Sequence, residues 1–235
     1  STDPRDQRSR PSIAVHWDDH CVVIDTGPDF RMQALREGLR KVDAVFYTHS
    51  HADHILGLDD LRPLSFLHKE KLPLYAEDAT AIILEKIFDY TLAADANYPN
   101  RARVTLNRLG DGAEVSGVRF ERIPLLHGHM EVAGFRFCNA AYLTHMNSIP
   151  KSSLALLRNL DVAIFDALRF KAHPSHSTLD QAIEWARQVA ARQSYFTHMS
   201  HEISHETIDK GLPPTMSLAF DGLRIPFEIS AETVS

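Results

Sequence analysis

The sequence predicts an α/β protein, a four-layer αβ/βα sandwich that forms one domain over residues 1–235. Two observations carry this prediction. The chain has 235 residues, of which 44% are apolar, and this is enough to bury a large core. The expected elements also fall into two β-rich halves with helices outside. A functional site is then expected where strand ends of both halves meet.

The first half is expected to hold short strands separated by helices. Short runs of β-forming apolar residues, bounded by turn residues, predict strands at 13–15, 21–25, 44–48 and 72–76. Apolar residues at helical spacing predict helices at 30–40, 55–67 and 78–90. The segment 91–103 has no clear period and is expected to be a surface loop.

The second half begins with a β pattern and continues as alternating helices and strands. Strands are expected at 104–109, 118–126, 132–137, 140–144, 162–167, 194–199, 217–220 and 224–229. Helices are expected at 152–160, 178–192 and 204–210. Thr178 and Gln181 have the spacing of a capping box, which places a helix start at Thr178.

Charge and cysteine usage limit the classes of partner and location. The formal net charge of -6 gives no general attraction to nucleic acid or anionic membrane, although a bound metal can make a pocket locally positive. Only Cys21 and Cys138 are present, and no apolar stretch approaches the roughly 18 residues needed to span a bilayer. Residues 1–12 lack the apolar core of a signal peptide. We therefore expect a cytoplasmic protein.

The segment Thr48–His54 contains three histidines and an aspartate directly after an expected strand. Imidazole and carboxylate groups are the ligands that borderline divalent metals prefer. Three more histidines, His127, His145 and His198, also follow expected strands. One histidine in such a place is more often structural, but its recurrence at four strand ends predicts a metal site.

These motifs resemble a known family. The run His49-Ser50-His51-Ala52-Asp53-His54 resembles the signature of the metallo-β-lactamase-fold hydrolases, and Asp25, His127 and His198 match further motifs of that superfamily. The segments 25–31, 57–64 and 197–201 are similar to the branch that contains phosphoribosyl 1,2-cyclic phosphate phosphodiesterase. The resemblance implies a phosphodiesterase that cleaves a small cyclic or nucleotide-like phosphate ester.

The resemblance also implies two divalent metal ions, Zn or Mn. One would be held by His49, His51 and His127, and the other by Asp53, His54 and His198, with a hydroxide between them as nucleophile. Asp25 is expected to accept the N–H of a ligand histidine. Besides Asp53, the catalytic residue implied is His176, which would protonate the leaving oxygen or bind a phosphoryl oxygen. A surface histidine flanking the next helix is an equally open interpretation of His176.

One departure from the family concerns the second metal. The family has an aspartate that bridges the two ions where this chain has His145. An imidazole binds only one ion. His145 is then a terminal ligand, the site holds a single ion, or the change leaves a metal-binding form with little or no turnover. Asp166 follows a neighbouring expected strand and could compensate, although a role behind the ligands or in the structure is favoured.

The start of the chain is a further departure. The family usually opens with a Gly-rich first strand, preceded in this branch by cysteines, and neither stands before Ser1. We expect the chain to lack that strand and the structural zinc that those cysteines would hold.

The substrate and partners are expected to be small. Arg31, Arg62 and His201 are candidate substrate-binding residues, since guanidinium groups bind phosphate bidentately. Salt bridges with nearby aspartates are an equal alternative for the arginines. The segment 91–103, the only candidate RNA-binding arm, offers just Arg101 and Arg103 as basic groups, so nucleic acid is not expected as a partner. The net charge of -6 and the lack of a spanning stretch make a membrane partner unexpected as well. A homodimer and a lactone, lactam or thioester hydrolase stay open.

Overall fold

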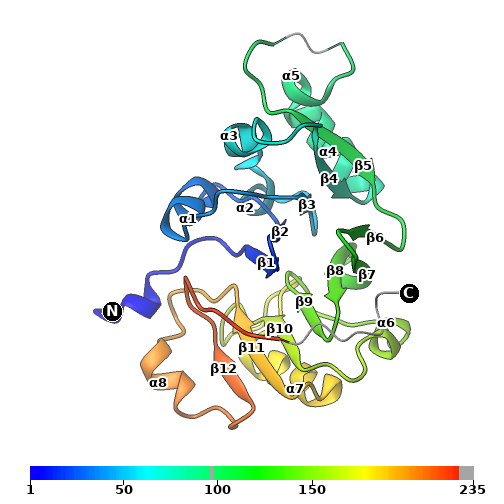
Figure 1. Cartoon of the computed structure of the whole chain (residues 1–235). Helices are drawn as coiled ribbons and strands as arrows, with labels where there is room; N and C mark the ends of the chain where they lie inside the picture. The colour runs from blue at the N-terminus through cyan, green and yellow to red at the C-terminus, as the bar shows by residue number, and fades with distance from the viewer. Residues whose placement is uncertain (96–97, 228–235) are drawn as a thin grey trace. The chain divides into compact units, whose positions relative to one another are not determined.

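The computed structural model describes residues 1–95 and 98–227, which form two compact units (Figure 1). The first, called here the N-terminal unit, is Ser9–Ser116. The second, called the C-terminal unit, is Gly117–Ser235 together with Ser1–Arg8. Each unit has its own cluster of buried apolar side chains. Within the described residues, no helix is long and apolar enough to cross a membrane. The cytoplasmic location stays a prediction.

The described part of the N-terminal unit contains a five-stranded sheet in the order β1-β2-β3-β4-β5. Its strands are β1 (Ile13–Trp17), β2 (His20–Ile24), β3 (Ala44–Phe46), β4 (Leu72–Ala76) and β5 (Val104–Arg108). Only the β1–β2 pair is antiparallel, and the later pairs are parallel. The carboxyl ends of β2 and β3 therefore lie at the same edge, where ligands gather in parallel sheets. Asp25 follows β2 there, and Thr48–His54 follows β3.

The helices of this unit are shorter than the sequence predicts. They are α1 (Phe30–Arg36), α2 (Ala52–Ile55), η2 (Leu58–Leu61), α3 (Arg62–Ser65), α4 (Asp78–Ile87) and α5 (Asp89–Leu92). The single helix expected at 55–67 is wrong because the chain turns at Gly57, whose N–H donates to Thr26 O (2.8 Å), and a new helix starts with Pro63 in its first turn. A short strand, β6 (Gly112–Val115), was not predicted.

Gly57 packs closely against Gly27 and Phe30, so a substitution at Gly57 tests this arrangement. A Cβ at Gly57 would lie 2.1 Å from Gly27 O and 2.9 Å from the Cβ of Phe30. Because a backbone oxygen cannot rotate away, Gly57→Ala is expected to destabilise the protein by about 1–3 kcal/mol, the usual cost of overpacking. Thermal unfolding measures this loss. The matched control is Gly110→Ala, since a Cβ at Gly110 meets nothing within 4 Å. An equal effect of the two substitutions would contradict the packing argument.

The sheet of the C-terminal unit contains β7 (Val118–His127), β8 (Met130–Phe137), β9 (Ala140–Leu143), β10 (Val162–Asp166), β11 (Gln193–Thr197) and β12 (Met216–Leu218). They lie side by side in the order β12-β11-β10-β9-β8-β7. The β7–β8 and β8–β9 pairs are antiparallel, and the pairs from β9 to β12 are parallel. Strands β7, β9, β10 and β11 therefore run in one direction. Their carboxyl ends bring His127, His145, Asp166 and His198 to one edge of the sheet.

The helical elements of this unit are η1 (Pro4–Asp6), α6 (Lys151–Leu156), α7 (Leu179–Val189) and α8 (His205–Asp209). Helix α7 packs against β10 (Figure 1). Its capping box is confirmed: Thr178 Oγ1 accepts the Gln181 N–H, and Gln181 Oε1 accepts the Thr178 N–H. The strand expected at 224–229 is wrong for residues 224–227, and residues 228–229 lie outside the described part of the chain.

The predicted α/β fold class is confirmed. The chain is a mixed α/β protein with two sheets and helices. The assignment of residues 1–235 to a single domain without the family's first strand stays a prediction.

Candidate metal centre

Asp25 organises the ligand loop of the N-terminal unit. Its carboxylate is fully buried, and its backbone lies in the left-handed region (φ 65°) that non-glycine residues adopt rarely. Oδ1 accepts the Thr48 N–H (2.8 Å), while Oδ2 accepts the Thr48 hydroxyl (2.8 Å) and His54 Nδ1–H (2.6 Å). Thr48 Oγ1 also lies 2.9 Å from His49 Nδ1. Because the Thr48 hydroxyl donates its hydrogen to Asp25 Oδ2, Thr48 Oγ1 is left to accept a hydrogen bond from His49 Nδ1–H. Both histidines thus keep Nε2 for a metal.

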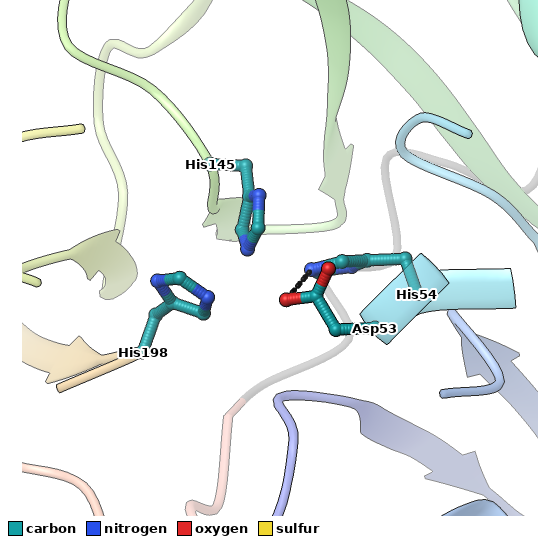
Figure 2. A group of neighbouring side chains, drawn as sticks. All are labelled: Asp53, His54, His145 and His198. Carbon is teal, nitrogen blue, oxygen red and sulfur yellow. Dashed lines mark ion pairs between the residues drawn. The ribbon is translucent and has the colours of Figure 1, made fainter. Parts of the chain in front are cut away.

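The remaining ligand candidates of this unit lie on the same loop. The His51 side chain is exposed, and its ring centroid is 4.5 Å from that of His49. The His49 and His54 rings are 4.4 Å apart. Asp53, in the first turn of α2, places Oδ2 3.6 Å from His54 Nε2, the dashed ion pair in Figure 2. Three imidazoles and a carboxylate this close together are a donor set that suits Zn²⁺.

Proton binding at His54 would compete with the predicted metal binding. Burial alone would lower the pKa of His54, but the buried Asp25 carboxylate, assisted by Asp53, outweighs burial and raises the pKa to about 9. In the metal-free protein, the His54–Asp25 ion pair makes its full contribution to the free energy of unfolding below the unfolded pKa of about 6.5. This contribution is lost as the pH rises through about 9.

This competition makes metal affinity depend on pH. A cation on Nε2 of His54 displaces one proton, so the apparent affinity should rise about tenfold per pH unit until pH 9. Zn²⁺ titrations between pH 6.5 and 9 measure this slope. A flat affinity over that window would show that His54 does not bind the ion.

Asp166 has the corresponding position in the C-terminal unit. It ends β10 and is fully buried. Oδ2 accepts His176 Nδ1–H (2.9 Å), and Oδ1 accepts His198 Nδ1–H (3.0 Å). Burial alone raises the pKa of Asp166, but the hydrogen bonds from the two histidines outweigh burial and hold the pKa below its usual range. Asp166 therefore stays ionised and fixes both rings with Nε2 directed away from it.

Four histidines of the C-terminal unit form a cluster around this anchor: His127, His145, His176 and His198. The rings of His145 and His198, both drawn in Figure 2, have centroids 3.9 Å apart. Both residues have left-handed backbones, with φ of 56° and 59°. Such strained conformations at strand ends are typical of functional sites. Ligand atoms lie within 4.8 Å of one another in two groups: His127, His145 and His176; and Asp166, His176 and His198.

The expected substrate-binding residues are on the surface. Arg31, on α1, and His201, which follows β11, are exposed. Arg62 is also exposed, and its Nη1 lies 3.5 Å from Asn100 O. It lines an open cleft of about 450 Å³ in the N-terminal unit, together with Asp59, Tyr90, Tyr98, Asn100 and Arg101. Whether these three residues bind substrate stays a prediction.

Sequence reasoning missed two residues that position the ligands. Thr48 links Asp25 to His49, and Asn147 joins the turn after His127 to the loop that carries His176. Both are next to or near a ligand histidine, and both have side chains that can donate and accept hydrogen bonds. Their closeness to candidate ligand histidines could have been noticed in the sequence. Their hydrogen-bond partners could not, because Asp25 and Pro174 lie far from them along the chain.

The chain matches the family model described as the beta-lactamase superfamily domain over residues 20–199. The chain belongs to this superfamily. The resemblance of the His49–His54 motif is confirmed by this match. The family binds divalent metals, and the side chains described above fit that requirement, because Asp25 and Asp166 hold histidines by Nδ1 and direct Nε2, a nitrogen that can bind a metal, away from the carboxylate.

Several known proteins are similar to this chain. A solved structure of a diphosphatase from the PhnP family is 47% identical, with a TM-score of 0.91 over 97% of this chain and 88% of that one. An octanoyltransferase from Porphyromonas gingivalis is 33% identical over 228 residues, which are 95% of this chain but 46% of that protein. A ribonuclease Z from Archaeoglobus fulgidus is 28% identical over 131 residues, which are 55% and 42% of the two chains. The chain thus spans less than half the length of these two curated relatives.

Proposed function

We propose that this chain is a divalent-metal-dependent phosphodiesterase that cleaves a small cyclic or nucleotide-like phosphate ester. The observation that carries the proposal is the pair of buried carboxylates, Asp25 and Asp166, which hold ligand histidines by Nδ1. Such outer carboxylates fix the tautomer and raise the basicity of a metal ligand. The similarity to a diphosphatase supports phosphorus rather than carbon as the atom attacked.

The ligand assignment follows the family resemblance. It makes His49, His51, Asp53 and His54 metal ligands of the N-terminal unit, and His127 and His198 metal ligands of the C-terminal unit. When bound, a divalent cation lowers the pKa of a coordinated water and offsets the charge that develops on the phosphoryl oxygens. The protein supplies the ligands in fixed orientations, with Asp25 and Thr48 behind the N-terminal ones and Asp166 behind the C-terminal ones.

Substrate phosphate groups require positive charge outside the ligand set. Arg31 and Arg62 are the proposed contacts, since an exposed guanidinium can bind a phosphate with two parallel hydrogen bonds. The aromatic rings of Tyr90 and Tyr98 line the Arg62 cleft and would suit a base or sugar face.

Hydrolysis of bis(p-nitrophenyl) phosphate tests the proposal. Protein loaded with Zn²⁺ or Mn²⁺ is expected to release p-nitrophenol, and chelator-treated protein is not. The His145→Asp variant, which restores the family's carboxylate, is expected to be at least as active, because a carboxylate can give one oxygen to each of two ions. Inactivity of both proteins under every metal tested would refute a phosphodiesterase.

A second candidate is hydrolysis of a diphosphate bond, which the 47% identical diphosphatase favours. The same metal-activated water would attack a phosphorus atom of the anhydride. A panel containing a cyclic phosphate, a nucleoside diphosphate, a lactone and a thioester discriminates among the candidates. Turnover of only the lactone or thioester would assign carbonyl chemistry instead.

A further inference from the structure

His145 lies among histidines of its own unit, at the position where the family has a bridging aspartate. Its ring centroid is 4.7 Å from that of His176 and 5.6 Å from that of His127, and the His127 and His176 rings are 4.6 Å apart. All three side chains are buried. One ligand atom of each lies within 4.8 Å of those of the other two. Three buried imidazoles from three separate segments thus converge.

Backbone hydrogen bonds fix His145 relative to His176. The residue after His145 is Met146, and its carbonyl oxygen accepts both the N–H (3.0 Å) and the hydroxyl (2.9 Å) of Ser177. Ser177 directly follows His176 and is fully buried. The loop after β9 and the loop before α7 are therefore joined one residue away from each histidine.

Asn147 fixes His127 to the same frame. Its N–H donates to Leu126 O (2.9 Å), and its Oδ1 accepts the Gly128 N–H (3.0 Å). Leu126 and Gly128 flank His127 on both sides. Asn147 Nδ2 also donates to Pro174 O (3.1 Å), which is on the loop that carries His176. One side chain thus ties the three ligand segments together, which is the preorganisation that a metal site requires.

The ring orientations and spacing suit a metal. His176 donates Nδ1–H to Asp166, so its Nε2 carries the lone pair. In a tetrahedral site, Zn–N bonds of 2.0–2.1 Å place the nitrogen atoms about 3.3 Å apart. The observed limit of 4.8 Å requires the rings to approach by no more than roughly 1.5 Å, within the reach of small side-chain rotations.

We infer that His127, His145 and His176 form a three-histidine site for one borderline divalent cation, Zn²⁺ or Co²⁺, inside the C-terminal unit. His176 is then a metal ligand and not the proton donor that the family resemblance implies. Three neutral imidazoles favour Zn²⁺ and Co²⁺ over Mn²⁺, which prefers oxygen ligands. Metal binding at this site does not depend on the proposed function. The inference rests on the proposed function only where the bound ion is given a catalytic role.

Metal titrations of the metal-free full chain test the site. Zn²⁺ affinity is measured by competition with a chromogenic chelator, and Co²⁺ binding by the visible absorption of a four- or five-coordinate ion. His145→Ala and His176→Ala are each expected to lower Zn²⁺ affinity by more than about 100-fold, beyond the cost of losing an outer hydrogen-bond partner. The matched control His129→Ala removes an exposed histidine two residues from His127 and should leave the affinity unchanged.

The double variant His49→Ala/His51→Ala separates this site from the family's ligand set. It is expected to retain one Zn²⁺ whose binding still requires His145. Loss of that ion from the double variant, or an unchanged affinity in His145→Ala, would overturn the inference. The variant His145→Asp keeps a metal ligand at this position but replaces a nitrogen ligand with an oxygen ligand. The ratio of its Mn²⁺ affinity to its Zn²⁺ affinity should be at least tenfold higher than that of the wild-type protein. An unchanged ratio would count against the site.

Far-ultraviolet circular dichroism of each variant verifies that it is folded. Hydrolysis by the wild-type protein is measured on the same samples. A wild-type protein that binds Zn²⁺ through His145 but hydrolyses nothing refutes the proposed function and leaves the three-histidine site standing.

Discussion

Replacing Asp166 with alanine is expected to lower Zn²⁺ affinity and phosphodiester hydrolysis by about 10²–10⁴-fold. Loss of an outer partner of one ligand histidine typically costs 10–100-fold, and Asp166 is the partner of two. Without it, His176 and His198 can rotate or adopt the tautomer with the proton on Nε2, where it blocks the metal. Chelator competition and initial rates measure both effects.

Two further variants identify the cause of this loss. In Asp166→Asn, the amide oxygen can still accept from one histidine, so the loss should be intermediate. Asp161→Ala is the matched control, because the Asp161 carboxylate, just before β10, pairs with the exposed Arg192. A normal affinity in Asp166→Ala would show that the carboxylate does not orient the ligands.

The metal-free Asp25→Ala variant is expected to lose about 3–5 kcal/mol of unfolding free energy, the usual cost of removing one partner from a buried ion pair. Both Asp25 and His54 are fully buried, and Asp25 also accepts two hydrogen bonds from Thr48. For a chain of this size, the loss corresponds to a decrease of roughly 6–20 °C in the unfolding temperature. Calorimetry of chelator-treated protein removes any contribution from the metal.

A surface carboxylate of the same unit is the control for Asp25. Asp78 is 83% exposed and lies 3.5 Å from Arg108, so Asp78→Ala should cost less than about 1 kcal/mol. The effect of Asp25→Ala should also shrink above pH 9, because His54 is then neutral in the wild-type protein. A loss that is the same at pH 7 and pH 10 would mean that the ion pair contributes little.

Local patterns in the sequence predicted much of the scaffold. Strand β4 and the capping box of α7 were predicted correctly because apolar alternation and the Thr178–Gln181 spacing are local signals. The candidate ligand histidines could be proposed from the sequence because His49, His127, His145 and His198 each follow a strand. The family match over residues 20–199 confirmed the superfamily.

The rest depended on contacts between segments distant in the sequence. The apolar spacing in residues 30–40 predicted helix α1 but not its buried face: Met32 and Leu35 are 68% and 63% exposed, while Phe30 is buried against the N-terminal core. The helical segment after His54 breaks at Gly57 because Gly27 packs against it. The hydrogen bonds of Thr48 with Asp25 and of Asn147 with Gly128 and Pro174 likewise join residues 19–27 positions apart.

The proposed function requires that histidines of this chain hold a catalytic divalent metal. Crystals grown with Zn²⁺ and measured at the zinc absorption edge test it directly. We predict an anomalous peak 2.0–2.1 Å from a nitrogen of His145, His127 and His176, the distance of a Zn–imidazole bond. Crystals with bound Zn²⁺ elsewhere but no peak within bonding distance of His127, His145 or His176 would contradict the claim.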